Sequence, residues 1–360
     1  MIKIVKSKKI EDYQNNQIAD IIKDYLIIKD IENRYGHIDY QLIEDRVIKL
    51  DLSDISTHVF GWNAITKFPD YISELELLTF LDLKFNRLKT LPKIIGKLVN
   101  LETIDLSYNK IENLPDSIGL LTSLKNLNLR YNQLKYIPKS FSSLQNLKNL
   151  DLRANQLNSF PSSLSKLVEL EKLDLHGNKL KGADLKLSTS NKLESIELGL
   201  NELEEVPHWL KKANKLIKLG LGGNKIKYLP DWIGNFQFLE ELNLYDNLIL
   251  VLPDSISKLK NLTHLSLWNN KLEILPKSFS MLSNLKVLNL SWNMFNELPY
   301  CIGDLKSLEI LTLWGNKLEK LPESLAQLHS LKKLDLNFTK IKIVPKFLRQ
   351  LEKEGLIIYK

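Results

Sequence analysis

The sequence is poor in residue types that mark several protein classes. Only one of its 360 residues, Cys301, is a cysteine, which excludes an internal disulfide. Arginine is also scarce, because only six of the 50 basic residues are Arg and the rest are Lys. Lysine is a solvated point charge, whereas arginine is the usual bidentate reader of phosphate. The net charge of +7 therefore indicates a soluble lysine-rich surface, and no nucleic acid partner is expected.

Long apolar runs are also missing. No run reaches the roughly 18–20 residues that a membrane span needs, so no membrane partner is expected. The N-terminal segment 1–9 has no apolar core of signal-peptide length. Together with the single cysteine, these features indicate a cytoplasmic, reducing-compartment protein, and we expect a monomer.

Catalytic and metal-binding motifs are not recognisable either. The six histidines form no H-E-x-x-H or other metal spacing, and no nucleophile stands with a base. The segment 220–225 faintly resembles a phosphate loop, but it lacks the Gly-Lys-Ser/Thr ending. We therefore expect no metal, no cofactor and no enzymatic activity.

What the sequence does contain is one pattern repeated every 23 residues. In segment 101–118 it reads L-x-x-I-x-L-x-x-N-x-I-x-x-L-P-x-x-I. Its asparagine belongs to a series that starts at Asn63 and continues at Asn86, Asn109, Asn132, Asn155, Asn178, Asn201, Asn224, Asn247, Asn270, Asn293 and Asn316. All twelve prolines stand six residues after a member of this series or after Thr339, which holds its next position. A fixed period of this length predicts a solenoid.

The pattern also predicts the shape of each repeat. The L-x-L segment alternates as a strand does, and identical units stacked in one direction form a parallel sheet. After the asparagine the apolar spacing changes to threes and fours, which indicates a short helical or 3₁₀ segment, with proline in its first turn. Strands pack about 4.8 Å apart and helices about 10 Å apart. The expected fold is an α/β solenoid, a curved horseshoe with a concave parallel sheet and the short helical segments on the convex side.

The repeated asparagine stands where the strand ends and the chain turns inward. A side-chain amide offers two donor hydrogens and an acceptor, so it can satisfy backbone groups of its own turn and of the neighbouring one. We expect the asparagines of this series from Asn86 to Asn316 to form a buried structural ladder, because buried polar groups must be paired.

Three segments are predicted along the chain. Residues 1–46 form a helix plus hairpin cap, residues 47–345 form the solenoid of about 12–13 repeats, and residues 346–360 form a helix–strand cap. The N-terminal helix ends at Gly36, and the hairpin strands 38–43 and 46–52 flank Glu44 and Asp45. The apolar face of that helix is expected to comprise Ile18, Ile21, Ile22, Tyr25 and Ile28.

Two irregularities interrupt the repeat. An eight-residue insertion at 54–61 is either a tolerated surface insertion or a contact loop. In the repeat at 178–200, Asp184 takes the place of the proline, and the strand positions beside it are glycines. This repeat is expected to be a weak point or a flattened part of the arc.

The motif from Leu101 to Ile118 resembles the leucine-rich repeat, in its 23-residue, proline-containing form of the bacterial and Ras-group intracellular type. The resemblance covers about residues 47–345. It implies a horseshoe whose concave face binds other proteins, often in signalling, and the Ras-group branch engages small GTPases.

The residues that the repeat leaves free on the concave side are the candidates for function. Aromatic and arginine side chains are enriched at interfaces. The candidate partner-binding residues are Phe85, Tyr108, Arg130, Tyr131, Arg153, Tyr245, Trp268, Trp292 and Trp314. Alternatively, the rings only cover the sheet and each other. Two columns of charge also run along the sheet, one of acidic residues four positions before the asparagines and one of basic residues two positions before them. The two columns could neutralise each other. Arg130 and Arg153 are the best candidates for a charged anchor.

These observations predict a non-enzymatic protein–protein interaction scaffold in intracellular signalling, with another protein, such as a small GTPase, on its concave face. The alternative is a receptor for a carbohydrate or small molecule that uses Tyr245, Trp268, Trp292 and Trp314 as stacking platforms.

Overall fold

The computed structural model of the chain describes residues 3–4, 15–54, 64–182 and 192–360. The chain divides into two compact units, Met1–Asn178 and Lys179–Lys360. The predicted insertion at 54–61, apart from Asp54, lies outside the described residues, as do Trp62 and Asn63. The same is true of residues 183–191 of the irregular repeat, including Asp184.

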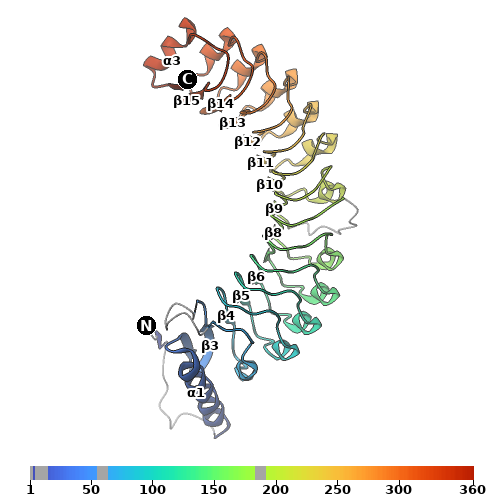
Figure 1. Cartoon of the computed structure of the whole chain (residues 1–360), viewed down its shortest axis with the longest axis vertical. Helices are drawn as coiled ribbons and strands as arrows, with labels where there is room; N and C mark the ends of the chain where they lie inside the picture. The colour runs from blue at the N-terminus through green and yellow to red at the C-terminus, as the bar shows by residue number, and fades with distance from the viewer. Residues whose placement is uncertain (1–2, 5–14, 55–63, 183–191) are drawn as a thin grey trace. The chain divides into compact units, whose positions relative to one another are not determined.

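The first unit begins with a helix and a hairpin (Figure 1). Helix α1 spans Asn15–Tyr35, and the antiparallel strands β2 (Asp39–Ile43) and β3 (Arg46–Asp51) follow it. Gly36 has a φ of 87°, a left-handed conformation that ends α1. Glu44 and Asp45 both have positive φ, 47° and 60°, which is the turn whose twist matches that of paired strands. The short strand β1 (Lys3–Ile4), which the pattern did not predict, pairs in parallel with β2.

From β3 onward the strands are short and parallel, with partners one repeat apart, as in Ile104 opposite Leu127. The first unit contains β4 (Phe80–Asp82), β5 (Thr103–Asp105), β6 (Asn126–Asn128), β7 (Asn149–Asp151) and β8 (Lys172–Asp174). The second unit contains β9 (Ser195–Glu197), β10 (Lys218–Gly220), β11 (Glu241–Asn243), β12 (His264–Ser266), β13 (Val287–Asn289), β14 (Ile310–Thr312), β15 (Lys333–Asp335) and β16 (Ile357–Tyr359). In each unit the strands lie on one side of the coil (Figure 1).

The other side of each unit consists of 3₁₀ helices. In the first unit they are η2 (Asp70–Glu74), η3 (Lys93–Lys97), η4 (Asp116–Leu120), η5 (Lys139–Ser143) and η6 (Ser162–Lys166). In the second unit they are η7 (His208–Lys212), η8 (Asp231–Asn235), η9 (Asp254–Lys258), η10 (Lys277–Met281), η11 (Tyr300–Asp304), η12 (Glu323–Gln327) and η13 (Lys346–Leu348). A proline precedes each of them as the N-cap, one residue before the first turn in which the pattern placed it. Its carbonyl accepts the first bond of the helix, as in Pro115 with the Ile118 N–H, and its missing N–H has no partner to lose there.

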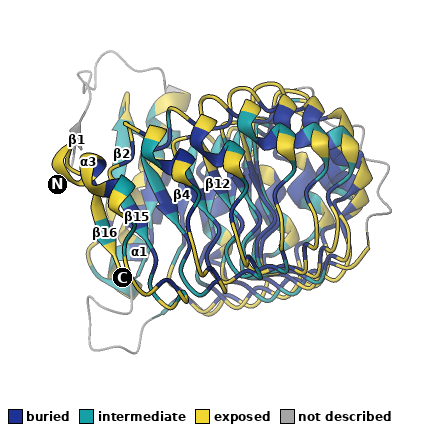
Figure 2. Cartoon of the chain, turned by 90° about the horizontal axis from the view of Figure 1, so that it is seen from above, coloured by how far each residue is buried: buried dark blue, intermediate teal, exposed yellow. Residues whose placement is uncertain are grey.

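The leucines of the repeat fill the space between strands and 3₁₀ helices, seen as dark blue residues inside the coil (Figure 2). Leu81, Ile104 and Leu127 of successive strands are at most 1% exposed, and Phe141 and Phe236 on the 3₁₀ side are fully buried. Each repeat thus contributes one layer of a continuous apolar core within its unit.

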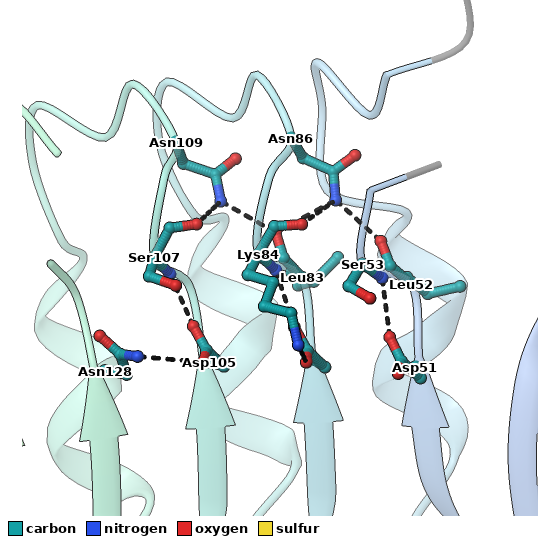
Figure 3. Close-up of polar contacts among 11 residues, drawn as sticks. Asp51, Leu52, Ser53, Leu83, Lys84, Asn86, Asp105, Ser107, Asn109 and Asn128 are labelled. Carbon is teal, nitrogen blue, oxygen red and sulfur yellow. Dashed lines mark hydrogen bonds and ion pairs between the residues drawn. The ribbon is translucent and has the colours of Figure 1, made fainter. Parts of the chain in front are cut away.

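The asparagines join these layers at the ends of the strands (Figure 3). Asn109 Nδ2 donates to the Leu106 carbonyl of its own repeat at 3.1 Å and to the Leu83 carbonyl of the preceding repeat at 2.9 Å. Its Oδ1 accepts the Leu88 N–H at 3.0 Å. The ladder asparagines from Asn86 to Asn316 are all at most 8% exposed. At the last position the Thr339 hydroxyl donates to the Leu336 carbonyl at 2.7 Å, as expected of a group with fewer bonds to offer.

Helix α1 attaches to the first unit through a buried ion pair. Asp24, only 1% exposed, accepts the Arg46 Nε–H at 2.8 Å and the Val47 N–H at 2.9 Å. This contact turns a different face inward than the sequence predicted. The helix buries Ile27, Ile28 and Ile31.

The predicted apolar face of α1 is therefore wrong at Ile22 and Tyr25 and confirmed at Ile28. Ile22 and Tyr25 are 52% and 58% exposed, and Ile18 and Ile21 are only partly covered. Helical spacing identifies rows of apolar residues, but it does not show which row faces the neighbouring strand. Here an acidic residue in the buried row, paired with an arginine, decides the orientation.

The chain end contains η13, the short helix α3 (Arg349–Lys353) and β16, which pairs in parallel with β15. Gly355, with a φ of 105°, separates α3 from β16, as the C-terminal glycine suggested. The division into segments 1–46, 47–345 and 346–360, and the capping role of the two ends, remain predictions.

We predict that Asn109→Leu lowers the free energy of unfolding by about 1–3 kcal/mol, because it leaves buried backbone groups of two repeats without partners. Urea denaturation measures the loss. The control is Asn113→Leu at an exposed position, expected to change stability by less than about 0.5 kcal/mol. Equal stability of the two variants would contradict the ladder's role.

We predict that Asp24→Ala destabilises the N-terminal end by about 3 kcal/mol, because Arg46 loses its buried partner. Limited proteolysis should then cleave α1 earlier than in the unmodified protein. Lys29→Ala removes an ion pair with Glu32 and a contact with the exposed Tyr25 ring, both at the surface, and it should leave the cleavage pattern unchanged. Unaltered protection of α1 in Asp24→Ala would refute the proposed attachment.

Candidate binding surface on the sheet

The candidate surface is formed by side chains that stand six, four, two and one residues before each ladder asparagine, called positions −6, −4, −2 and −1. The residue at −1 lies in the turn that follows the strand. In Phe85, Tyr108 and Tyr131 it has a left-handed φ of 54–56°. Other repeats have glycine there, as at Gly177 and Gly223. Because bulky residues rarely adopt this conformation, the aromatic side chains need compensating contacts.

Those contacts exist in the first unit. The rings of Phe85 and Tyr108 stack with centroids 4.4 Å apart and planes 16° apart. Tyr108 and Tyr131 stack at 4.5 Å and 9°. The two outer rings remain 44% and 46% exposed. We call these three residues the N-terminal aromatic column. Stacking accounts for the column's geometry, and it leaves ring surface open to solvent.

The charged columns of this unit partly cancel each other. Lys84 Nζ lies 2.7 Å from Asp82, and Arg153 lies 3.3 Å from Asp151 and 3.0 Å from Asp174. Burial raises the pKa of Asp82 and of Asp174 above the ordinary aspartate value, although the neighbouring cations oppose the shift. Of the two predicted anchors, Arg153 is thus occupied within the sheet.

Position −4 has a second role that the sequence analysis missed. Asp105 Oδ1 accepts the Ser107 N–H at 2.8 Å, and Asp51 does the same for Ser53 at 2.9 Å (Figure 3). The same bond recurs at Asp151, Asp174, Asn243 and Asn289. An aspartate or asparagine here closes the strand-end turn. The sequence signal was present, because Asp and Asn dominate this position, but it was interpreted as charge alone.

Not every position expected to be exposed is open. Asp82, Ser107 and Ser291 are 3%, 0% and 2% exposed. Asp82 is covered by its partner Lys84, and the two serines are short side chains between longer ones. Alternation along a strand shows which side a residue faces, and the neighbours' lengths decide whether water reaches it.

The second unit has the C-terminal aromatic cluster, defined as Tyr245, Trp268, Trp292, Trp314 and Phe338. Tyr245 and Trp268 lie 6.1 Å apart, Trp292 and Trp314 meet edge to face at 5.5 Å, and Trp314 and Phe338 lie 6.0 Å apart. Trp292 and Phe338 are 48% and 80% exposed. The two aromatic groups lie in different units.

Two rings of this cluster lie directly against glycines of the adjacent repeat. A Cβ at Gly222 would lie 2.2 Å from the Tyr245 ring, and one at Gly315 would lie 3.0 Å from the Trp292 ring. The absence of a side chain therefore lets each ring lie against the backbone of the adjacent repeat. This role of Gly222 was not predicted, because the sequence of a single repeat does not show which neighbour covers a glycine.

Within the described ranges, no group of three or more His, Cys, Asp or Glu side chains could hold a metal ion. None of the helices in those ranges has the length and apolar character of a membrane span. Cys301 lies half-buried in η11, and burial raises the pKa of its thiol. Trp209 lies in η7 and is buried, so it is not part of the candidate surface.

Comparisons with known proteins agree with this architecture. The model of the leucine-rich repeat region matches residues 60–219 and 276–353, and the leucine rich repeat model matches residues 237–295. A leucine-rich repeat protein of Leptospira interrogans is 32% identical, with a TM-score of 0.70, over 87% of this chain and 90% of that one. The chain belongs to the leucine-rich repeat family, whose fold commonly serves as a protein-interaction scaffold and whose members are generally non-enzymatic.

Two further structures show the range of similar proteins. An internalin of Listeria monocytogenes has a TM-score of 0.74 at 22% identity, and the match covers 96% of both chains. The plant peptide hormone receptor RGFR1, solved in complex with RGF2, has a TM-score of 0.67 at 26% identity over 86% of this chain and 54% of that one. No curated protein sequence matched significantly.

We predict that Cys301 reacts slowly with iodoacetamide, because its raised pKa lowers the thiolate fraction near pH 8. The rate should be several-fold below that of the same chain in denaturant, and it should keep rising above the ordinary thiol pKa of about 8.5. Mass spectrometry of timed samples measures the rate. Alkylation as fast as in the denatured chain would show that the thiol is not protected.

Proposed function

We propose that this protein is a non-catalytic scaffold that binds a partner protein on the sheet side of its repeats. The observation that carries the proposal is the set of aromatic side chains left open there. Phe85, Tyr131 and Trp292 are 44–48% exposed, although the apolar core is complete without them. Large, rigid rings with part of their surface free are typical of the residues that dominate binding energy at interfaces.

We also propose an oligomeric state, a cellular location and a class of partner. The small positive net charge, the single cysteine and the repeat type favour a monomer that acts in intracellular signalling in the cytoplasm. A small GTPase is the first partner class to test, because the 23-residue proline-containing repeat resembles that of the Ras-group proteins.

A second candidate is carbohydrate recognition by the C-terminal aromatic cluster. Beside the rings, position −4 carries the uncharged polar side chains Ser266, Asn289 and Thr312. Flat aromatic surfaces next to neutral hydrogen-bonding groups suit a sugar ring. A glycan array distinguishes the two candidates, because protein binding predicts no glycan signal that depends on Trp268 or Trp314.

We predict that two double variants, Phe85→Ala with Tyr131→Ala and Trp292→Ala with Trp314→Ala, differ in partner capture. Affinity purification from the native cell followed by mass spectrometry identifies the partners of the unmodified protein. The variant that removes the contact surface should lose its partner by more than about tenfold, since truncating two anchoring rings costs over about 2 kcal/mol.

The matched control is Tyr136→Ala with Tyr300→Ala, which removes two rings that are 56% and 67% exposed but lie away from the sheet. It should capture the same partners as the unmodified protein. Unchanged capture by both sheet variants would exclude the aromatic residues as the contact, and loss by the control would point to another surface.

A further inference from the structure

One basic side chain of the first unit lacks the carboxylate that its counterparts have. At position −2, Lys84 is paired with Asp82, and Arg153 is paired with Asp151 and Asp174. Arg130 occupies the same position one repeat before Arg153. Within the described part of the chain its guanidinium forms no ion pair and donates no hydrogen bond, and its Nε is buried.

The reason lies two residues earlier. Position −4 of this repeat is Asn128, where the repeats on both sides have Asp105 and Asp151. The Asn128 amide donates to the Asp105 carboxylate at 3.0 Å (Figure 3). Its own oxygen accepts the backbone N–H of Arg130 at 3.2 Å. The strand-end turn is thus closed as elsewhere, but the negative charge that would balance Arg130 is missing.

The guanidinium is nevertheless held in place. Its central carbon lies 5.2 Å from the centroid of the Tyr108 ring, in the middle of the N-terminal aromatic column. Such cation–π contact orients the group without consuming its N–H donors. A half-buried guanidinium whose N–H groups have no acceptor is stabilised when a ligand supplies one. A carboxylate matches its geometry, because it can accept two parallel N–H bonds.

We propose that Arg130 and the N-terminal aromatic column form a docking site for an acidic side chain of a partner protein, a glutamate or aspartate next to an apolar residue. The carboxylate accepts hydrogen bonds from Arg130, and the apolar neighbour covers the exposed ring surface of Tyr131. This inference rests on the proposed scaffold function and specifies the chemistry of its partner.

A carboxylate fits this site better than a phosphate group. One guanidinium balances a single negative charge, and the adjacent strands carry Asp105 and Asp151 on the same face. A phosphate group of a modified residue carries about −1.5 to −2 charges near pH 7, so it meets more repulsion there.

The test uses the six arginines of the chain, because their Nε–H groups produce few NMR signals. The Arg130 signal is assigned by its loss in Arg130→Lys. The probe is a hexaglutamate peptide with blocked ends, and hexaglutamine is its uncharged equivalent. Hexaglutamate is expected to shift the Arg130 signal in a saturable manner, and hexaglutamine is expected to leave it in place.

The decisive variant is Asn128→Asp, which supplies an internal carboxylate at the spacing that pairs Asp82 with Lys84. Adjacent aspartates are tolerated in this sheet, as Asp151 and Asp174 show, so the variant should fold. Its affinity for hexaglutamate should fall about tenfold or more, the effect of one charged hydrogen-bonded contact. Asn243→Asp makes the same change where position −2 is Tyr245, and it should bind like the unmodified protein.

Three results would overturn the inference: no shift of the Arg130 signal with hexaglutamate, equal affinity in Asn128→Asp, or a larger shift with inorganic phosphate at equal negative charge. Failure here is distinguishable from failure of the scaffold function. If the aromatic double variants still lose the cellular partner while hexaglutamate leaves Arg130 unaffected, the scaffold stands and the acidic-partner inference is wrong.

Discussion

Each ladder asparagine from Asn86 to Asn316 hydrogen-bonds the backbone of two adjacent repeats at once, and the rest of each unit depends on this arrangement. Asn109 connects the carbonyls of Leu83 and Leu106, so the ends of two strands keep a constant offset. Because the amide is buried, any slip between repeats would leave several polar groups unpaired. The apolar core supplies most of the stabilisation, but leucines alone tolerate small shifts. The ladder makes the strand ends repeat in register, and this register determines where the side chains on the sheet point.

The ladder and the leucine core determine the fold, whereas other positions of the repeat determine the chemistry of the sheet surface. Position −1 has a left-handed φ in every repeat from Phe85 to Phe338, and it holds glycine at Gly223 but a tyrosine at Tyr131. Position −2 holds Gly222 in one repeat and Trp268 in another. The ladder hydrogen bonds are the same in both cases, since they use only the backbone and the ladder asparagine, Asn224 in one repeat and Asn270 in the other. Membership of the family therefore specifies the fold, and the choice of partner depends on these variable positions.

The charged side chains on the sheet of the first unit also differ in how much they reveal about a partner. Most acidic and basic residues neutralise one another locally, as Asp82 does with Lys84, and such pairs say little about ligands. A residue without its usual counterpart is more informative. Arg130 is one, and it stands out only because its neighbours show what pairing at that position looks like. Arginine and aromatic rings together combine directional hydrogen bonding with apolar area, the two components that a specific interface needs.

Periodic features were predictable from sequence, and relations between different repeats were not. The positions of Asn, Pro and Leu by themselves determined the parallel strands, the proline-led 3₁₀ helices and the ladder, because each repeat imposes the same local geometry. The buried face of α1, the pairing of Asp24 with Arg46, and the placing of Tyr245 over Gly222 were decided only in the tertiary structure. So was the contrast between a compensated Arg153 and an uncompensated Arg130. The physical reason is that these contacts depend on side-chain direction and length across neighbouring elements, which spacing along one chain does not contain.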